Sequence, residues 1–316
     1  MIERLRGKKI LVTGGAGFIG SHIVDKLVEC GAEVVVLDNL VAGKLENLEH
    51  NLGKIEFVKG DITDEACLAK VLKGVEMVSH QAALRSVPKS VQIPQEYHRV
   101  NVSGTLDLFL KAKEAGVRRI TFASSSSIYG ERSNFPERET DLAKPVSPYA
   151  ATKVMGEKYA YVFSKLYGLE VVSLRYFNVF GPRQSLENEY AVVIPKFITC
   201  LLDNQRPPIY GNGKQERDFS YIDNVVEANL LALTKEGIAG EVFNIASGTP
   251  ESVNKLLAVL NKIMSKRIKA EYLAVRPGDV LKTHADISKA KKVLSWKPKV
   301  NFYQGLERTV AWFKKR

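Results

Sequence analysis

The 316-residue chain has little cysteine, no long hydrophobic run and no internal repeat, and each absence excludes a class of protein. Its cysteines, Cys30, Cys67 and Cys200, are isolated from one another, which excludes a disulfide framework and a thiolate zinc site, so no metal is expected. No apolar run approaches the roughly 20 residues that span a bilayer, so no membrane association is expected. The first residues, MIERLRGKKI, lack the apolar core of a signal peptide, which predicts a cytoplasmic protein.

The residues that are present are typical of a globular protein with a sizeable core, since 45% are hydrophobic and 26% are charged. The formal net charge is +11, which raises the possibility of a nucleic-acid partner. The basic residues, however, occur as scattered doublets without aromatic interleaving, so nucleic-acid binding is not expected. A solvated basic surface explains them, and its field would also attract an anionic small molecule.

The first half of the chain alternates apolar runs of strand length with stretches of helical length. Strands are expected in KKILVTG, EVVVLD, KIEFVKGD, VEMVSHQA, VRRITFASSS and LEVVSLRYFN. These runs show little polar alternation, so we expect both faces of each strand to be buried, as in a parallel sheet covered by helices. The pattern predicts an α/β fold with a doubly wound parallel sheet over residues 1–175.

After residue 175 the regular alternation stops, and turn-rich segments interrupt shorter helices. This composition predicts a smaller substrate-binding lobe over residues 176–316. Residues 218–248 contain FSYIDNVVEANLLALT and EVFNIAS, which again have the pattern of sheet-associated elements. We therefore expect this segment to return to the first domain.

A glycine-rich turn, residues 14–20, follows the first strand and opens a helix, which is the context of a dinucleotide-binding site. Glycines at positions 14, 17 and 20 would allow a pyrophosphate close to the backbone, at the positive end of the helix. Asp38 ends the next strand, where a carboxylate accepts both adenosine ribose hydroxyls and repels a 2′-phosphate. No arginine follows it directly, so NAD is favoured over NADP. Asp61 and Ile62 follow the third strand, where adenine would lie, although Asp61 is equally explained as a helix cap.

Tyr149 and Lys153 lie one helical turn apart on one face of a predicted helix that begins at Pro148. This pair suits proton transfer at an alcohol. A free tyrosine titrates near ~10, too high for a base at neutral pH. A nearby lysine cation, together with a positive nicotinamide ring, would lower that pKa.

A run of serines, residues 124–127, ends the fifth strand. In an open parallel sheet, ligands bind at the carboxyl ends of the strands, so these hydroxyls are candidates to hold a sugar beside Tyr149. A polar exit from strand to loop is the alternative explanation.

These motifs together resemble the extended short-chain dehydrogenase/reductase superfamily. The resemblance is carried by TGGAGFIGSH, VVVLDNL, GDITD, HQAA, NVSGT, SSSSIYG, SPYAATK and RYFNVFGPR. The later segments RDFSYIDNVVEA and RPGDVLKTHADISKAKKVLSWKP are similar to its nucleotide-sugar 4-epimerases, of the UDP-glucose and UDP-N-acetylglucosamine type. The match covers nearly the whole chain and implies a Rossmann domain, bound NAD and a UDP-sugar substrate.

The resemblance also implies roles for individual residues. Tyr149 would be the acid/base, Lys153 its electrostatic partner and Ser125 the hydrogen-bond partner of the reacting 4-hydroxyl, with Ser124 or Ser126 as one-residue alternatives. The residues that would contact the cofactor are Gly14, Gly17, Phe18, Ile19, Gly20, Asp38, Asn39, Gly43, Asp61, Ile62, Gln81, Ala82, Ala83, Arg85, Asn101, Tyr149, Lys153, Tyr176 and Phe177. The residues that would contact the substrate are Ser125, Ser126, Asn178, Tyr210, Asn212, Arg217, Arg276, Asp279 and Thr283.

The expected reaction is 4-epimerisation, in which Tyr149 takes the proton of the 4-hydroxyl while a hydride leaves C4 for NAD. Family dehydratases and decarboxylases place carboxylates where this chain has Ser126-Ser127-Ile128, so elimination is not expected. By resemblance Thr283 would act as a size gate, and its small side chain would admit N-acetylated sugars as well as glucose and galactose. A UDP-uronic acid 4-epimerase is the nearest alternative, and an NAD-binding regulator without catalysis is the alternative of a different class.

Two long helices, expected over residues 94–116 and 146–166, carry more apolar residues than one sheet face needs. By resemblance they would form an intermolecular four-helix bundle, so a homodimer is expected. The alternative is that both helices pack only on their own sheet.

Overall fold

The computed structural model describes residues 2–185, 193–275 and 280–315. Its centre is a seven-stranded parallel sheet in the order β11-β6-β5-β4-β1-β2-β3. The strands are β1 (Lys9–Thr13), β2 (Glu33–Asp38), β3 (Ile55–Lys59), β4 (Met77–His80), β5 (Arg119–Ser125), β6 (Glu170–Tyr176) and β11 (Val242–Ile245). The predicted doubly wound parallel sheet is therefore confirmed.

The chain builds this sheet outward from β1 in two directions. It first adds β2 and β3 on one side, then returns to place β4 beside β1 and continues through β5 and β6. Residues 242–245 of β11 pair in parallel with residues 173–176 of β6. The order reverses between β1 and β4, and a crevice outside the strand ends at such a reversal is where open α/β sheets bind ligands.

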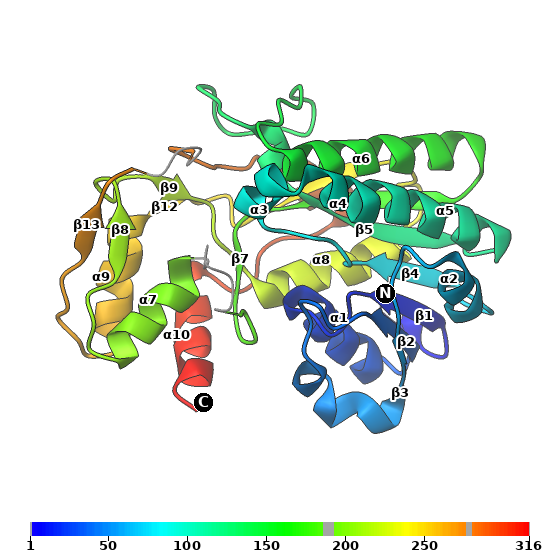
Figure 1. Cartoon of the computed structure of the whole chain (residues 1–316), viewed down its shortest axis with the longest axis horizontal. Helices are drawn as coiled ribbons and strands as arrows, with labels where there is room; N and C mark the ends of the chain where they lie inside the picture. The colour runs from blue at the N-terminus through cyan, green and yellow to red at the C-terminus, as the bar shows by residue number, and fades with distance from the viewer. Residues whose placement is uncertain (1, 186–192, 276–279, 316) are drawn as a thin grey trace.

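Helices cover both faces of the sheet because its strands are apolar on both faces (Figure 1). Ile10 and Val12 of β1 pack into one core cluster with α1 (Phe18–Glu29) and α8 (Ile222–Thr234). Leu11, between them, packs into a second cluster with α2 (Glu65–Val71), α5 (Gly104–Glu114) and α6 (Pro148–Leu166). This alternation follows from the two-residue repeat of side chains along a strand.

The predicted helix over residues 94–116 forms as consecutive pieces of one rod. They are α4 (Pro94–His98), a π-helical segment η4 (Arg99–Ser103) and α5. The short helix α3 (Val87–Gln92) precedes them. The remaining short helices are η1 (Ile2–Leu5), η2 (Leu45–Asn47), η3 (Glu49–Lys54), η5 (Ser126–Tyr129) and η6 (Ala290–Leu294).

A smaller lobe lies to one side of the sheet, on the left of Figure 1. Its helices are α7 (Val193–Leu202), α9 (Val253–Ile263) and α10 (Phe302–Phe313). Its short strands are β8 (Pro208–Tyr210), β9 (Glu216–Arg217), β12 (Glu251–Ser252) and β13 (Glu271–Leu273). The strands β7 (Val179–Phe180) and β10 (Ser220–Tyr221) pair where the chain passes from the sheet to this lobe. No described helix combines the length and the apolar character needed to cross a membrane.

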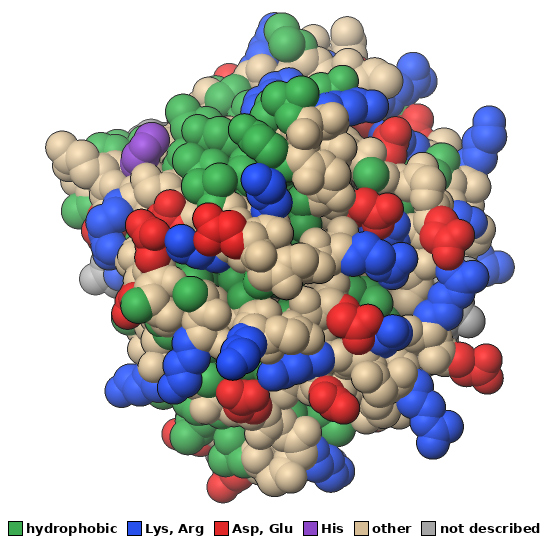
Figure 2. Space-filling model, turned by 90° about the vertical axis from the view of Figure 1, so that its right-hand side faces the viewer, with side chains coloured by type: hydrophobic (Ala, Val, Ile, Leu, Met, Phe, Trp, Pro, Cys, Tyr) green, Lys and Arg blue, Asp and Glu red, His purple; other side chains and the backbone are tan. Residues whose placement is uncertain are grey.

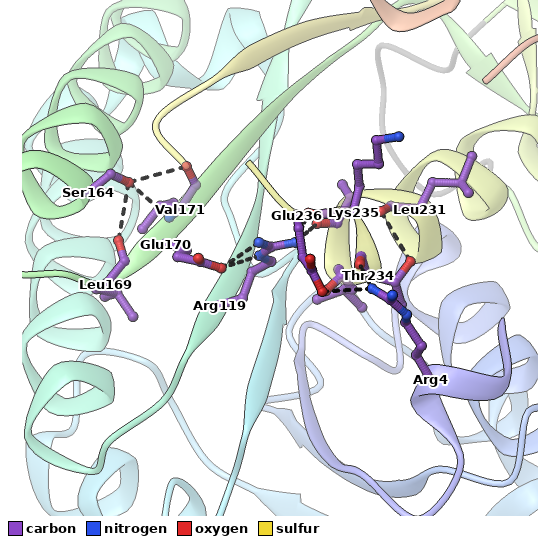
Figure 3. Close-up of polar contacts among 12 residues, drawn as sticks. Arg4, Arg119, Ser164, Leu169, Glu170, Val171, Leu231, Thr234, Lys235 and Glu236 are labelled. Carbon is purple, nitrogen blue, oxygen red and sulfur yellow. Dashed lines mark hydrogen bonds and ion pairs between the residues drawn. The ribbon is translucent and has the colours of Figure 1, made fainter. Parts of the chain in front are cut away.

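A buried arginine connects the sheet to α8 at the amino-terminal end of β5, away from the crevice (Figure 3). The Arg119 guanidinium, fully buried at the start of β5, donates to Glu170 at 2.7 Å. It also donates to the carbonyl of Ala232 at 3.3 Å and to that of Lys235. These carbonyls are the ones that the end of a helix leaves without partners, so Arg119 caps α8 and neutralises its charge with Glu170.

Candidate active site

A cavity of about 540 Å³ opens along the carboxyl ends of β1, β2, β3, β4, β5 and β6. Its walls include most of the residues expected from the sequence. These are Gly14, Gly17, Phe18, Ile19, Gly20, Asp38, Asn39, Gly43, Asp61, Ile62, Gln81, Ala82, Ala83, Arg85, Ser125, Tyr149, Lys153, Tyr176 and Asn178. One continuous cavity therefore joins the glycine turn to the Tyr149 region.

The glycine turn forms a cradle made of backbone alone. Gly14 has a φ of +66°, and a Cβ on it would lie 2.7 Å from the Ala82 nitrogen. A Cβ on Gly20 would lie 2.1 Å from the Gly14 carbonyl oxygen. Gly17 caps α1 without any side-chain hydrogen bond, so the first turn of the helix keeps backbone N–H groups for a ligand. The shape and the partial positive charge of this cradle fit a dinucleotide pyrophosphate.

Asp38 is held rigidly at the end of β2. Its carboxylate accepts from the Ala16 nitrogen at 2.9 Å and from the Leu40 nitrogen at 2.8 Å. Burial raises the pKa of this carboxyl, and the two backbone bonds act in the opposite direction. A carboxylate fixed on the cavity wall suits the ribose hydroxyls of adenosine and disfavours a 2′-phosphate.

Asp61 is not the cap of the following helix. Asp64 caps α2 by accepting from the Cys67 nitrogen, while Asp61 accepts from the Thr63 nitrogen at 2.9 Å. Its other oxygen accepts from the Asn39 amide at 2.8 Å. Asp61 therefore orders the loops at the adenine end of the cavity and also lines it.

Tyr149 and Lys153 lie in the first turns of α6, which begins at Pro148 after the cap Ser147. The Lys153 ammonium donates to the Ala123 carbonyl at 2.8 Å and lies 5.9 Å from the centre of the Tyr149 ring. Burial lowers the pKa of Lys153 to about 8. The pair thus faces the cavity from one side of the helix, as the spacing predicts.

The protein groups by themselves raise the pKa of Tyr149, and the expected lowering, which also invokes the positive nicotinamide ring, stays a prediction. Burial raises the pKa of the phenol, and a hydrogen bond with Ser125 and the positive charge of Arg85 offset this only in part. Lys153, whose ammonium donates to the Ala123 carbonyl, is not among the groups that shift this pKa. Arg85 is the cation that acts on Tyr149.

The serine run separates into different roles. Ser125 lies beside Tyr149 and accepts from the Ser127 nitrogen at 3.2 Å. Ser124 is buried and donates to Glu157 at 2.6 Å. Ser126 begins η5 and is not among the residues that line the cavity. Of the three alternatives, Ser125 has the geometry to share a ligand hydroxyl with Tyr149.

Two expected cofactor residues lie behind the wall rather than on it. Asn101 donates to the Leu84 carbonyl at 2.9 Å and accepts from the Leu84 nitrogen at 2.8 Å, so it shapes the wall through that loop. Phe177 is completely buried in the core next to Tyr129. Tyr176 does line the cavity, and its phenol donates to Asn229 at 3.0 Å.

The expected substrate residues divide between the cavity and the lobe beyond it. Asn178 lines the cavity, and its amide donates to the Thr283 hydroxyl at 2.9 Å. The same hydroxyl accepts from the Asp218 nitrogen at 3.1 Å. Tyr210, Asn212 and Arg217 lie in the smaller lobe, away from the cavity wall. Arg276 and Asp279 lie outside the described residues.

Several residues that the structure places in or near the cavity had no role assigned to them from the sequence. Arg183, Gln184 and Phe313 line the cavity, and Phe313 comes from the last helix. Arg183 stands in the RYFNVFGPR segment but carried no assigned role. Glu157 pairs with Arg175 at 2.8 Å in the interior, one turn after Lys153. Its position four residues after Lys153 was the available signal.

Comparison with known proteins gives consistent results along the chain. The profile of the NAD dependent epimerase/dehydratase family matches residues 10–246. A putative UDP-glucose 4-epimerase of Methanocaldococcus jannaschii is 43% identical over 307 residues, covering 96% of this chain and 98% of that protein.

Solved structures agree with the same assignment. A UDP-N-acetylglucosamine 4-epimerase of Methanobrevibacter ruminantium, in complex with UDP-N-acetylmuramic acid, has a TM-score of 0.94 and 43% identity, covering 98% of this chain and 99% of that chain. A Thermus thermophilus UDP-glucose 4-epimerase in complex with NAD has a TM-score of 0.89 and 37% identity, covering 97% and 99% of the two chains.

Proposed function

The chain belongs to the NAD-dependent epimerase/dehydratase family, and from that membership we propose that it interconverts UDP-glucose with UDP-galactose and UDP-N-acetylglucosamine with UDP-N-acetylgalactosamine. It is an isomerase of the UDP-sugar 4-epimerase type, with NAD as its cofactor. The observation that carries the proposal is the placement of Tyr149, Ser125 and Lys153 in the same cavity as the glycine turn.

The residues present fit the cofactor at both ends of the cavity. The backbone cradle at Gly14 and Gly20 would hold the phosphates, and Asp38 would hold the adenosine ribose. Lys153 would reach the nicotinamide ribose from α6. When bound, NAD supplies a reversible hydride acceptor for C4 of the sugar.

Tyr149 moves the proton in the proposed reaction. As a phenolate it takes the proton of the 4-hydroxyl, while Ser125 holds the same oxygen by a hydrogen bond. The Arg85 charge favours the phenolate, and the positive nicotinamide ring would add to it. After the 4-keto sugar turns about its diphosphate, the hydride would return to the opposite face of C4, and Tyr149 returns the proton to the C4 oxygen.

The tolerance for N-acetylated sugars rests on Thr283. Its side chain is small, which leaves room for a larger sugar but does not reject a smaller one. Its hydroxyl is also bonded to Asn178 and to the Asp218 nitrogen, so Thr283 supports the wall near the substrate as well.

Incubation of the purified protein with UDP-glucose, UDP-N-acetylglucosamine or UDP-glucuronate, without added NAD, tests the proposal. We expect 4-epimers of the first two on chromatography, and none from Tyr149→Phe. If UDP-glucuronate is the one sugar nucleotide of the three that is epimerised, the substrate is a UDP-uronic acid and the proposed substrates are wrong. Bound NAD with no product from any sugar would instead indicate a regulator without catalysis.

We also propose that the protein is a homodimer joined through α5 and α6. Figure 2 shows hydrophobic side chains gathered on the upper part of one face, level with α5 and α6 in Figure 1. Leu110 on α5 and Met155, Tyr161, Val162 and Leu166 on α6 are all exposed. A second copy of this surface would cover them in a four-helix bundle.

Sedimentation of a charged variant tests the dimer. Leu166→Glu places a charge on the exposed face of α6, and we expect it to sediment as a single chain. Leu142→Glu is the matched control, because Leu142 is equally exposed but lies outside both helices. A dimer that persists in Leu166→Glu would contradict the proposed interface.

A cytoplasmic location is part of the proposal. Cys30, Cys67 and Cys200 are all free thiols, a state that reducing compartments maintain. UDP-sugar substrates are consistent with the same compartment. Fractionation of cells expressing the tagged chain would test it.

A further inference from the structure

The turn over residues 181–185 connects the sheet to the smaller lobe and forms part of the cavity wall. It follows β7 directly, and Arg183, Gln184 and Ser185 line the cavity. Arg183 has a φ of +66°, a left-handed backbone conformation that residues other than glycine rarely adopt. Such a conformation persists only where surrounding contacts hold it.

The contacts that hold this turn come from α1. The His22 ring nitrogen Nε2 lies 3.0 Å from the Pro182 carbonyl oxygen, which can only accept, so Nε2 carries the proton. Asp25, three residues further along the same face of α1, pairs with the Arg183 guanidinium at 2.8 Å. Burial lowers the pKa of His22 to about 4, so the ring is neutral at neutral pH and donates through one nitrogen.

Asp25 is itself firmly placed. Its other carboxylate oxygen accepts from the His50 ring at 2.8 Å and from the Asn51 amide at 2.8 Å, both in η3. The carboxylate therefore meets Arg183 from a fixed position rather than from a mobile side chain.

Gln184 has a buried carbonyl oxygen on the cavity wall that is available to a ligand. It is only 5% exposed, and its amide nitrogen donates to the Val179 carbonyl at 2.8 Å. Its carbonyl oxygen has no hydrogen-bond partner in the described parts of the chain. A buried acceptor without a partner is costly, and a donor on a molecule bound in the cavity would remove that cost.

We propose that α1 holds the turn 181–185 against the bound dinucleotide, with Asp25 and His22 as the positioning residues. We call their contacts with Arg183 and Pro182 the latch. The first turn of α1 would receive the phosphates, and its next two turns hold residues 181–185, which form part of the cavity wall. This inference rests on the proposed function, in which the sugar exchanges at each turnover while NAD stays bound. The latch explains how the cofactor is retained when the sugar leaves.

Asp25→Asn tests the latch, because asparagine keeps the size of the side chain and an acceptor for His50 and Asn51 but removes the charge opposite Arg183. We measure the amount of NAD bound per purified chain. We also measure the rate at which this NAD is released when a competing dinucleotide is present in excess. We expect release to be about tenfold faster than in the wild type. We also expect epimerisation to depend on added NAD, with a raised KM for NAD and kcat close to that of the wild type at saturation.

Two matched controls separate the latch from general destabilisation. Asp223→Asn removes a more exposed ion pair of similar length, with Arg308 at 2.9 Å between α8 and α10, and should release NAD at the wild-type rate. Asn51→Ala removes the support from η3 and leaves the Arg183 pair in place. Because Asn51 also helps to place Asp25, we expect NAD release from Asn51→Ala to be faster than in the wild type but slower than from Asp25→Asn. Faster release from Asn51→Ala than from Asp25→Asn would assign the effect to η3 and overturn the latch.

A second variant tests the latch independently of Asp25. His22→Phe removes only the bond to Pro182 and should also release NAD faster than the wild type, so the latch can be tested even if Asp25→Asn does not fold. Wild-type rates in both variants would overturn the latch and leave the proposed function intact. A wild-type chain that holds no NAD but binds it weakly would overturn the retained cofactor and the latch together.

Discussion

Thr283→Val distinguishes an anchoring role of Thr283 from a role as a size gate. Valine has nearly the same volume as threonine, so the space for a sugar does not change. The hydroxyl, however, accepts from the Asn178 amide at 2.9 Å and from the Asp218 nitrogen at 3.1 Å. Thr283 is 8% exposed and Asp218 is fully buried, so water cannot replace the acceptor that the Asp218 nitrogen loses.

The magnitude follows from the donors that are left without an acceptor. A buried N–H group without an acceptor costs about 1–3 kcal/mol, and we expect the free energy of unfolding of Thr283→Val to fall by that amount. Because Asn178 lines the cavity and would keep only its longer bond to the Asp218 carbonyl at 3.2 Å, kcat/KM should fall by a similar factor for UDP-glucose and UDP-N-acetylglucosamine. The ratio between the two sugars should stay unchanged.

Urea unfolding and epimerisation assays measure the two effects. Thr283→Ser keeps the acceptor and should retain most of the stability. Thr309→Val is a matched control, because this equally buried hydroxyl only donates to the Gly305 carbonyl within α10 and leaves no donor unsatisfied. A Thr283→Val protein as stable and as active as the wild type would refute the anchoring role. Selective loss of N-acetylated sugars in Thr283→Tyr would support the size gate.

Two further predictions concern the glycine cradle and a buried carboxyl. Gly20→Ala should contain no bound NAD, because the added Cβ would lie 2.1 Å from the Gly14 carbonyl oxygen. Gly53→Ala, whose added Cβ has nothing within 4 Å, should bind NAD normally. Absorbance measures the bound NAD, and a wild-type level in Gly20→Ala would contradict the role of the cradle. Burial raises the pKa of Glu137 to about 7, so its folded-state pKa lies above its unfolded value. The stability that this carboxyl contributes is complete below about pH 4.5 and is lost as the pH rises to 7, an effect of about 3 kcal/mol. Unfolding of wild type and Glu137→Gln across that range should diverge, and parallel curves would disprove the shift.

The sequence alone predicted the sheet because its signal is local. Apolar runs such as 10–12 and 34–37 can only be buried on both faces, and the helical stretches between them impose parallel crossovers. The catalytic pair was equally readable, since the distance between Tyr149 and Lys153 on a helix follows from the helical repeat. The position of Asp38 at the end of the second strand predicted its contact with the cofactor, the resemblance added Gln81, and both line the cavity.

Contacts between distant segments could not be predicted in this way. Residue spacing cannot show that Lys153 donates to the Ala123 carbonyl, and that bond is why the lysine does not contact the phenol oxygen. The resemblance gave Thr283 the role of a size gate, but the sequence could not show that its hydroxyl meets a residue 105 positions away in the chain. Phe313 offered no signal, because only the return of α10 toward the sheet brings it to the cavity. The division into residues 1–175 and 176–316 stays a prediction.

The sequence by itself determined the fold, the family and the chemical groups at the reaction centre, because periodicity and motif spacing act over a few residues. Only the tertiary structure decided what those groups face. Burial set the direction of the Tyr149 pKa, and the approach of residues 181–185 to α1 joined Asp25 to Arg183. Electrostatic and packing energies depend on which segments meet, and that is a property of the folded chain.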